Sequence, residues 1–370
     1  MNAHTKATTL VFNPDLPEYA PDIRQFQGCP TLSVTRGGRI FAGWYSGGNA
    51  EPRIENYDIL VYSDDGGRSW SKPLFFIPSS KEELVHSIDI QTFIDPDGKL
   101  HVYWVQNDVK KSGEKPCRPW SPEHPVCEAE GFIFDDLEHS TWEVVCEDPD
   151  ADEIKFSEPR YVFAGFMRCK PLFLSSGKWL AFAYDQLSDR HAYNVSLDKG
   201  KTWTRCHGGK KLFTPFDEGM AYEMQDGEVR LFVRNELGEI GEGYSYDGGE
   251  TWTDTKLCGV PSPSTRFYVS RTPSGRILLV HNDHNKSRTN MTIKLSDDDG
   301  KTWKYSVCID DRNELSYPDA DFHDGKIYLI YDRERRGAME ILFASFTEED
   351  IMKGEKPKVS IISKPGLTKI

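Results

Sequence analysis

The amino-acid sequence predicts an all-β fold, a six-bladed β-propeller built from four-stranded antiparallel blades. Three observations predict it. An eight-residue turn pattern recurs four times, a second glycine-containing turn alternates with it, and short strand-like runs separate the two kinds of turn. Because no long helical segment or linker interrupts this series, we expect a single domain over residues 1–370.

The recurring turn reads Ser-x-Asp-x-Gly-x-Thr/Ser-Trp. Its four copies are Ser63–Trp70, Ser196–Trp203, Ser245–Trp252 and Ser296–Trp303. The Ser and Asp oxygens can accept backbone N–H bonds inside a tight turn, and Gly can adopt a positive φ. The Trp supplies an apolar plate that can pack against a neighbouring blade. We expect the pattern to be architectural, with a degenerate fifth copy at Ser140–Trp142.

The second turn signal is a dipeptide of Asp or Ser followed by Gly. It occurs at Asp97-Gly98, Ser176-Gly177, Asp226-Gly227, Ser274-Gly275 and Asp324-Gly325. The resulting unit is strand, Gly turn, strand, loop, strand, recurring turn, strand. The predicted blades start near Cys29, Ser87, Cys169, Glu218, Phe267 and Tyr317. We expect residues 8–12 and 358–362 to pair and close the ring, and the Pro-rich residues 115–126 to form an insertion loop.

Composition narrows the class of partner. The formal net charge is -14, which argues against nucleic acid and anionic membrane, since both bind basic faces. The chain has no apolar run of about 20 residues, as a membrane span would need, and its first residues lack a signal-peptide pattern. We therefore expect a soluble cytoplasmic protein, or a secreted or periplasmic one if a leader has been removed.

The cysteines and histidines give no sign of a metal centre. The eight cysteines are scattered, without a CxxC pair or Cys/His ligand spacing, so no zinc site and no cofactor are expected. A structural calcium ion and the oligomeric state stay open.

The recurring turns resemble the BNR or Asp-box repeats of the sialidase (neuraminidase) superfamily. In that family a tyrosine nucleophile is activated by a glutamate, and three arginines bind the substrate carboxylate. The resemblance implies that Glu218 is the base, in Asp217-Glu218 followed by Glu223-Met-Gln-Asp-Gly, and that Tyr317 is the nucleophile, in Leu315-Ser-Tyr-Pro-Asp. It places two carboxylate-binding arginines at Arg234 and Arg288.

Two departures make the chain a divergent member. Where sialidases read F-R-I-P, this chain reads Phe26-Gln-Gly-Cys-Pro30, so the first arginine of the grip is missing. The family's acid/base residue lies in the loop before the first recurring turn, and here Glu55 or Glu51 would have to serve.

Other cations and histidines stand near the ends of predicted inner strands. Arg266, Lys170, Arg333 and His281 are further candidates for substrate binding, whereas Arg335 and Arg336 are expected to face solvent. His86 is a candidate catalytic base at the same rim, because an unperturbed imidazole titrates near neutral pH.

These residues support three hypotheses of function. The first is a retaining, sialidase-like exo-glycosidase that removes a terminal acidic sugar from an oligosaccharide or glycoconjugate. The second is a polysaccharide lyase that cleaves a uronic-acid linkage, such as rhamnosyl-glucuronate, with His86 or Tyr317 removing the proton. The third is a non-catalytic glycan-binding propeller, which needs the arginines but not the Tyr–Glu pair.

Overall fold

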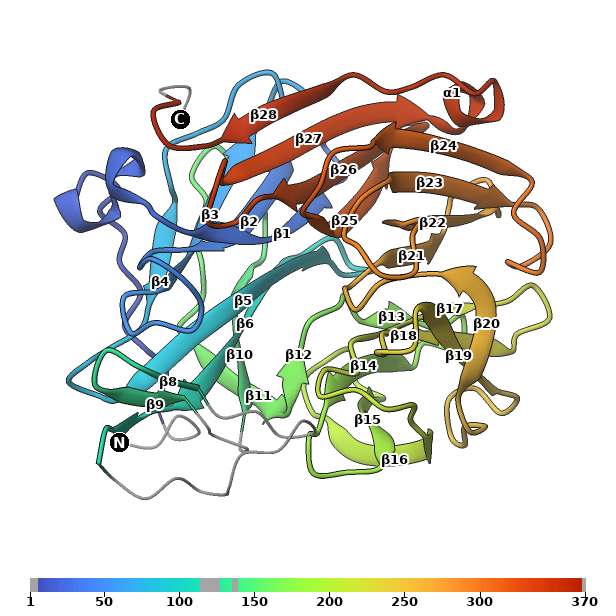
Figure 1. Cartoon of the computed structure of the whole chain (residues 1–370), viewed down its shortest axis with the longest axis horizontal. Coiled ribbons are helices and arrows are strands. Elements are labelled where there is room, and N and C mark those ends of the chain that lie inside the picture. The colour runs from blue at the N-terminus through green and yellow to red at the C-terminus, as the bar shows by residue number, and fades with distance from the viewer. Residues whose placement is uncertain (1–5, 114–126, 135–138, 368–370) are drawn as a thin grey trace. The chain divides into compact units, whose positions relative to one another are not determined.

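The computed structural model describes residues 6–113, 127–134 and 139–367, and their regular secondary structure is almost entirely β-strand (Figure 1). The chain divides into two compact units. The first unit comprises Met1–Phe166, Ile330–Phe343 and Ser360–Ile370, and the second comprises Met167–Leu329 and Ala344–Val359. None of the described helices has the length and apolarity needed to cross a bilayer.

Two four-stranded antiparallel sheets form most of the first unit. One has the order β1 (Gln27–Val34), β2 (Ile40–Ser46), β3 (Tyr57–Ser63), β4 (Phe75–Pro78). The other has the order β5 (Val85–Ile94), β6 (Leu100–Asp108), β10 (Ser140–Cys146), β11 (Arg160–Ala164). Large apolar side chains of both sheets, among them Phe41, Phe75, Trp104 and Trp142, share one buried cluster.

A small three-stranded sheet is inserted between β6 and β10. It consists of β7 (Lys110–Lys111), β8 (Cys127–Ala129) and β9 (Phe132–Phe134). The Pro-rich residues 115–126, predicted to be an insertion loop, lie outside the described residues.

Three further sheets belong to the second unit, apart from Phe166 at the start of the first. The first contains β12 (Phe166–Met167), β13 (Leu172–Phe173), β14 (Trp179–Tyr184), β15 (Arg190–Ser196) and β16 (Thr204–Lys210). The second is β17 (Gly219–Glu223), β18 (Val229–Val233), β19 (Glu239–Ser245), β20 (Lys256–Pro261). The third is β21 (Tyr268–Arg271), β22 (Ile277–Asn282), β23 (Met291–Ser296), β24 (Tyr305–Asp310).

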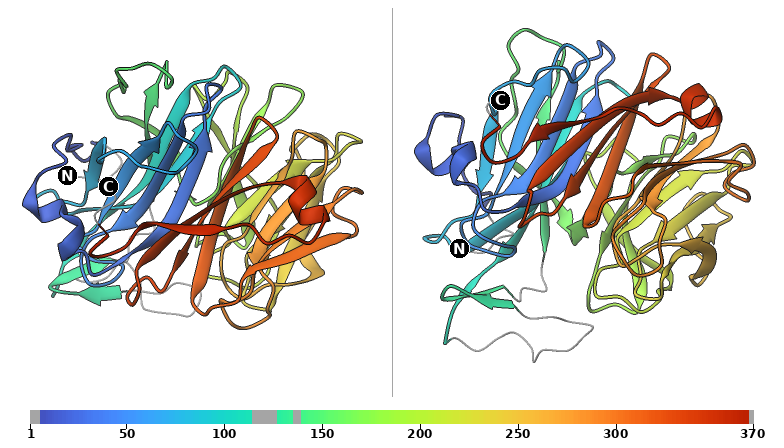
Figure 2. Two further views of the ribbon diagram at one scale, coloured as in Figure 1. Left: turned by 90° about the horizontal axis from the view of Figure 1, so that it is seen from above. Right: turned by 45° about the horizontal axis from the view of Figure 1, so that its top comes forward.

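The residues of the last sheet are divided between the units. Its strands are β25 (Leu315–His323), β26 (Lys326–Arg333), β27 (Glu340–Thr347) and β28 (Val359–Ser363). The short helix α1 (Glu348–Met352) connects β27 to β28 (Figure 2). The helix starts at Thr347, whose hydroxyl accepts the Asp350 N–H while the Asp350 carboxylate accepts the Thr347 N–H.

All four copies of the recurring turn adopt the same structure. Each joins the third strand of a sheet to the fourth, and in each the Ser hydroxyl donates to the Asp carboxylate at 2.7–2.9 Å. The glycine N–H donates to the same Ser oxygen at 2.8–2.9 Å. The Trp252 ring packs edge-on against Phe182 of the preceding sheet, 5.3 Å between centroids. The pattern is therefore architectural, as predicted.

The predicted all-β class, the four-stranded sheets and the alternation of turns are confirmed. Each predicted start lies within or beside the first strand of a sheet. The degenerate copy at Ser140–Trp142 is wrong, because these residues open β10 and Trp142 pairs with Trp104 across the sheet. The segment lacks the Asp and Gly that the turn requires and has β-branched and aromatic residues instead.

The expected pairing of the two ends is also wrong. Val11 forms an isolated bridge with Phe76 of β4, and β28 pairs with β27 as the outermost strand of its sheet. Val11 therefore lies along the outer edge of the first sheet, whereas β28 is itself the outer edge of the last sheet.

Candidate functional site

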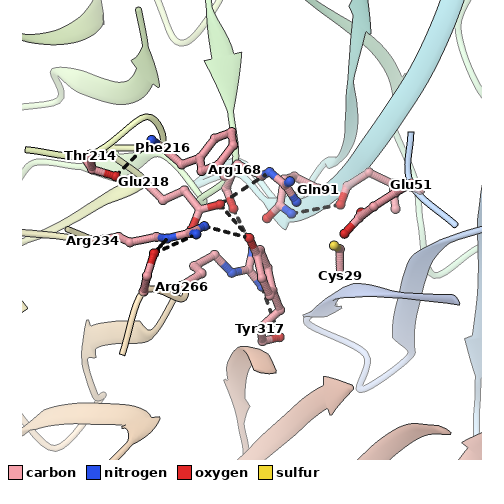
Figure 3. Close-up of polar contacts among 12 residues, drawn as sticks. Cys29, Glu51, Gln91, Arg168, Thr214, Phe216, Glu218, Arg234, Arg266 and Tyr317 are labelled. Atoms are coloured by element: carbon pink, nitrogen blue, oxygen red, sulfur yellow. Dashed lines mark hydrogen bonds and ion pairs between the residues drawn. The ribbon is translucent and has the colours of Figure 1, made fainter. Parts of the chain in front are cut away.

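A buried tyrosine–glutamate pair occupies the second unit (Figure 3). The Tyr317 hydroxyl donates to Glu218 Oε1 at 2.8 Å, although the two residues are 99 positions apart in the chain. Tyr317 lies in β25 and Glu218 directly precedes β17, and the residues are 3% and 2% exposed. A carboxylate that accepts this hydrogen bond can also accept the proton, so the pair has the geometry of a nucleophile with its base.

Arg234 completes a triangle with this pair. It directly follows β18, and its Nη1 donates to Glu218 Oε2 and to the Tyr317 hydroxyl, both at 3.1 Å. Its Nε and Nη2 donate to the Ser264 hydroxyl at 3.1 and 3.0 Å. Every nitrogen of this guanidinium is thus hydrogen-bonded within the protein, and Arg234 orients the pair whether or not a ligand is present.

Arg168 is a fourth member of the cluster, and sequence reasoning missed it. Its Nε lies 3.6 Å from Glu218 Oε1, and its guanidinium carbon lies 5.1 Å from the centroid of the Tyr317 ring. No family motif pointed to Arg168. It adjoins Cys169, however, which was predicted to start a blade, so testing the cations beside each predicted start would have found it.

The charges in the cluster decide the protonation state of Glu218. Burial alone would raise the pKa of this carboxyl, but the positive charges of Arg234 and Arg168 and the hydrogen bond from Tyr317 outweigh burial and lower the pKa. Conversely, the carboxylate outweighs burial at Arg234 and raises the pKa of the guanidinium. Glu218 is therefore anionic at neutral pH and is able to accept a proton.

Arg266 and Arg288 also lie around Tyr317, as predicted, but they differ in their contacts. The guanidinium of Arg266 donates to three backbone carbonyl oxygens, those of Arg168, Tyr317 and Pro318. Arg288 is partly exposed, donates to the Ser264 carbonyl at 2.9 Å and lies 5.8 Å from the Tyr317 ring centroid.

Lys170 and His281 belong to the same unit but bind other groups. Lys170 Nζ donates to the Ala320 carbonyl at 2.8 Å and lies 3.4 Å from Asp319 Oδ2. His281 is fully buried, with Nδ1 3.0 Å from the Pro261 carbonyl. Burial, helped by the charge of Lys294, lowers the pKa of His281 to about 4, so it is neutral at physiological pH.

The two acid/base candidates lie in the first unit and differ in environment. Glu55 is exposed and forms an ion pair with Lys81 at 2.5 Å. Glu51 is partly buried. Its Oε1 accepts a hydrogen bond from Arg335 at 2.8 Å, whereas its buried Oε2 has no hydrogen-bond partner among the described residues. Arg335 also donates to Asp332 at 3.0 Å, so the expectation that Arg335 faces solvent is wrong.

His86 and Arg333 also lie in the first unit. His86 is the second residue of β5, near the start of an inner strand as expected. It is buried, and its Nε2 lies 2.8 Å from the Tyr45 hydroxyl. Burial, with the nearby His139, lowers the pKa of His86 to about 3. Arg333 forms ion pairs with Glu340, at 3.1 Å, and with Glu334.

No metal centre emerges from residues 6–113, 127–134 and 139–367. They contain no group of three or more His, Cys, Asp and Glu side chains that could hold a metal ion. Of the predicted site residues, the structure brings together Tyr317, Glu218, Arg234, Arg266 and Arg288.

Curated relatives of the chain are sialidases. The chain is 29% identical over 207 residues to "Anhydrosialidase" of Macrobdella decora, which covers 50% of this chain and 26% of that protein. It is also 29% identical over 150 residues to "Sialidase" of Micromonospora viridifaciens, covering 37% of this chain and 23% of that protein. The matches therefore span about a quarter of each relative's length.

Solved structures share the fold. The leech intramolecular trans-sialidase in complex with 2,7-anhydro-Neu5Ac superposes with a TM-score of 0.67 at 14% identity, over 94% of this chain and 71% of that chain. The BNR repeat-like domain pattern matches residues 38–330, which is most of the chain. The protein therefore belongs to the BNR repeat-like domain family.

Proposed function

We propose that the protein is a retaining exo-glycosidase of the sialidase type, which removes a terminal acidic sugar from a glycan. The observation that carries the proposal is the 2.8 Å hydrogen bond from Tyr317 to an anionic Glu218 inside a ring of arginines. We further propose that the five four-stranded sheets and the five-stranded sheet of β12 to β16 are the blades of a single six-bladed propeller domain over residues 1–370, as the family and the solved structures suggest.

In the proposed reaction, the Tyr317 oxygen attacks the anomeric carbon while its proton passes to Glu218. The bond to the leaving glycan breaks as an acid protonates the leaving oxygen, and water then cleaves the tyrosyl intermediate with net retention. A neutral phenol suits an anionic substrate, because a carboxylate nucleophile would be repelled by the substrate's own carboxylate. Arg288 and Arg168, which both lie beside the phenol ring, would bind that carboxylate through forked hydrogen bonds.

The central test is Tyr317→Phe assayed on sialyllactose and on an aryl sialoside, with product mass recorded. The mass distinguishes hydrolysis from formation of an anhydro sugar, which is one water lighter. We expect turnover to fall to background because the nucleophilic oxygen is gone. Tyr222→Phe is the matched control, since Tyr222 is also a buried tyrosine of this unit, and its hydroxyl donates to the Asp299 carbonyl. Full turnover by Tyr317→Phe would contradict the proposal.

For the acid, we propose Glu51 rather than Glu55. One oxygen of Glu51 accepts a hydrogen bond from Arg335 and the other has no partner in the described part of the chain, whereas Glu55 is paired with Lys81 on the surface. Glu51→Gln should lower turnover of sialyllactose by about 10²–10⁴-fold and spare an aryl sialoside, whose leaving group needs no proton. Glu55→Gln is the matched control and should leave both rates unchanged. The reverse result would assign the role to Glu55.

The lyase hypothesis is not carried forward. No observation favours it over hydrolysis: of its two candidate bases, His86 is buried and hydrogen-bonded to Tyr45, and Tyr317 is hydrogen-bonded to Glu218 within the arginine cluster.

A further inference from the structure

The backbone at Tyr317 has a conformation that its sequence disfavours. Its φ is +52°, in the left-handed region that non-glycine residues seldom adopt. The next residue is Pro318, and a residue before proline normally has a φ of about -120°. The Tyr317 side chain, whose hydroxyl must be placed accurately, is therefore carried by strained backbone. That backbone would relax to a more favourable φ if the surrounding residues did not hold it.

Arg266 is in position to prevent that relaxation. Its Nη2 donates to the carbonyl oxygens of Tyr317, at 3.3 Å, and Pro318, at 3.2 Å. Its Nη1 donates to the carbonyl of Arg168 at 2.6 Å. One planar guanidinium thus ties the two peptide units that follow Tyr317 to the segment that carries Arg168, and the Arg168 guanidinium lies over the Tyr317 ring.

Arg266 also supports the phenol itself. Its guanidinium carbon lies 5.2 Å from the centroid of the Tyr317 ring, within the range of a cation–π contact. Arg266 is only 3% exposed, and its three carbonyl hydrogen bonds already engage both terminal nitrogens. Because both terminal nitrogens of the Arg266 guanidinium already donate to backbone carbonyls, it is poorly placed to bind a substrate carboxylate as well.

We propose that Arg266 is a positioning residue, which fixes the backbone and ring of Tyr317 for attack and does not bind the substrate. The inference rests on the proposed function, because it gives Arg266 a role only if Tyr317 is the nucleophile. It replaces the substrate-binding role that the sequence suggested for Arg266.

The test compares kcat and KM for three variants on one aryl sialoside. Arg266→Met should lower kcat by about 100-fold, the cost of a misplacement of about 1 Å in a reacting group, while KM changes less than about threefold because ground-state binding is kept. Arg266→Lys should recover part of the lost kcat, since an ammonium can still reach some of the carbonyls. Arg288→Met should show the opposite pattern, a raised KM.

Arg230→Met serves as the folding control. Arg230 is another buried arginine of the second unit, hydrogen-bonded to Glu242 and to the Tyr222 hydroxyl, and it has no contact with Tyr317 among its hydrogen bonds. If Arg266→Met does not fold, Arg266→Lys carries the test through its intermediate kcat at unchanged KM.

Any one of four results would overturn the inference. A raised KM with normal kcat in Arg266→Met would make Arg266 a substrate-binding residue, and wild-type values in both constants would leave it no role. Wild-type turnover by Tyr317→Phe would remove the proposed function itself, and this inference with it. An inactive Tyr317→Phe together with a fully active Arg266→Met would refute the positioning role of Arg266 and leave the proposed function intact.

Discussion

Replacing Glu218 by glutamine should weaken both the fold and the activity, since its carboxylate has a part in each. The substitution keeps the shape of the side chain and removes its charge. In the native protein that charge faces Arg234 Nη1 at 3.1 Å and Arg168 Nε at 3.6 Å, and it accepts the Tyr317 hydroxyl at 2.8 Å. Glutamine leaves the two buried guanidinium groups without their anion.

The geometry sets the size of the effect on stability. At an effective dielectric constant of about 20, charges 3.1 and 3.6 Å apart attract by about 5 kcal/mol each. The penalty for burying the carboxylate offsets much of this sum, and removing one partner of a buried ion pair typically costs about 3–5 kcal/mol. We therefore expect Glu218→Gln to lower the free energy of unfolding by about 3–5 kcal/mol.

The effect on activity has a separate cause. A glutamine cannot accept the phenol proton, and loss of a general base typically lowers kcat by about 10²–10⁴-fold. Equilibrium unfolding in urea measures the first effect, and turnover of an aryl sialoside measures the second. Glu242→Gln is the matched control, because Glu242 forms a buried ion pair with Arg230 at 2.5 Å in the same unit. The control should lose stability but keep its kcat.

Acid titration gives the expected pH dependence. Because the pKa of Glu218 is lower in the folded than in the unfolded state, its anion stabilises the fold above the unfolded pKa. This stabilisation is lost as the pH falls through the folded pKa, and Glu218→Gln should not show that loss. A variant with wild-type stability and wild-type kcat would refute the reasoning about both the charge cluster and the base.

Two further predictions concern the charge cluster and the recurring turn. Arg168→Met should raise the pKa of Glu218, because the positive charge of Arg168 no longer offsets the effect of burial. The acidic limb of the pH profile of kcat/KM should therefore move to higher pH, and an unmoved limb would contradict this. Gly249→Ala should cost about 2–4 kcal/mol of unfolding free energy in urea, from a positive φ and a contact with Leu180. Gly248→Ala, with the same strain but open space, should cost about 1–2 kcal/mol; equal costs would refute the clash.

The sequence was most informative where local chemistry determines structure. The recurring turn needs Ser, Asp and Gly at fixed positions for its own hydrogen bonds, so its four copies located the connections between strands correctly. Ser140–Trp142 matched the pattern only in its Ser and Trp. Because this segment lacks the Asp and Gly that form the turn's own hydrogen bonds, it pairs with β6 and forms a strand.

The site was predictable where a family motif marked a residue, or, for Arg266, where the residue stood beside a predicted inner strand. The resemblance to family motifs predicted that Tyr317 and Glu218 act together, and in the structure the two side chains are hydrogen-bonded. Arg168 carries no motif, and its role arises from which strands pack near β25. The burial of His86 was not predictable either, because it arises from Tyr45 and Phe134, which come from other strands. Such long-range neighbours are not visible in a local pattern.

The central claim is that Tyr317 forms a covalent bond with the sugar, and direct trapping tests it. A 2,3-difluorinated sialic acid slows breakdown of the intermediate, so the intact protein can be weighed and the labelled peptide sequenced. We predict one sugar adduct on Tyr317, absent in Tyr317→Phe and formed more slowly in Glu218→Gln. An adduct on a carboxylate, or turnover of substrate with no adduct at any position, would contradict the account.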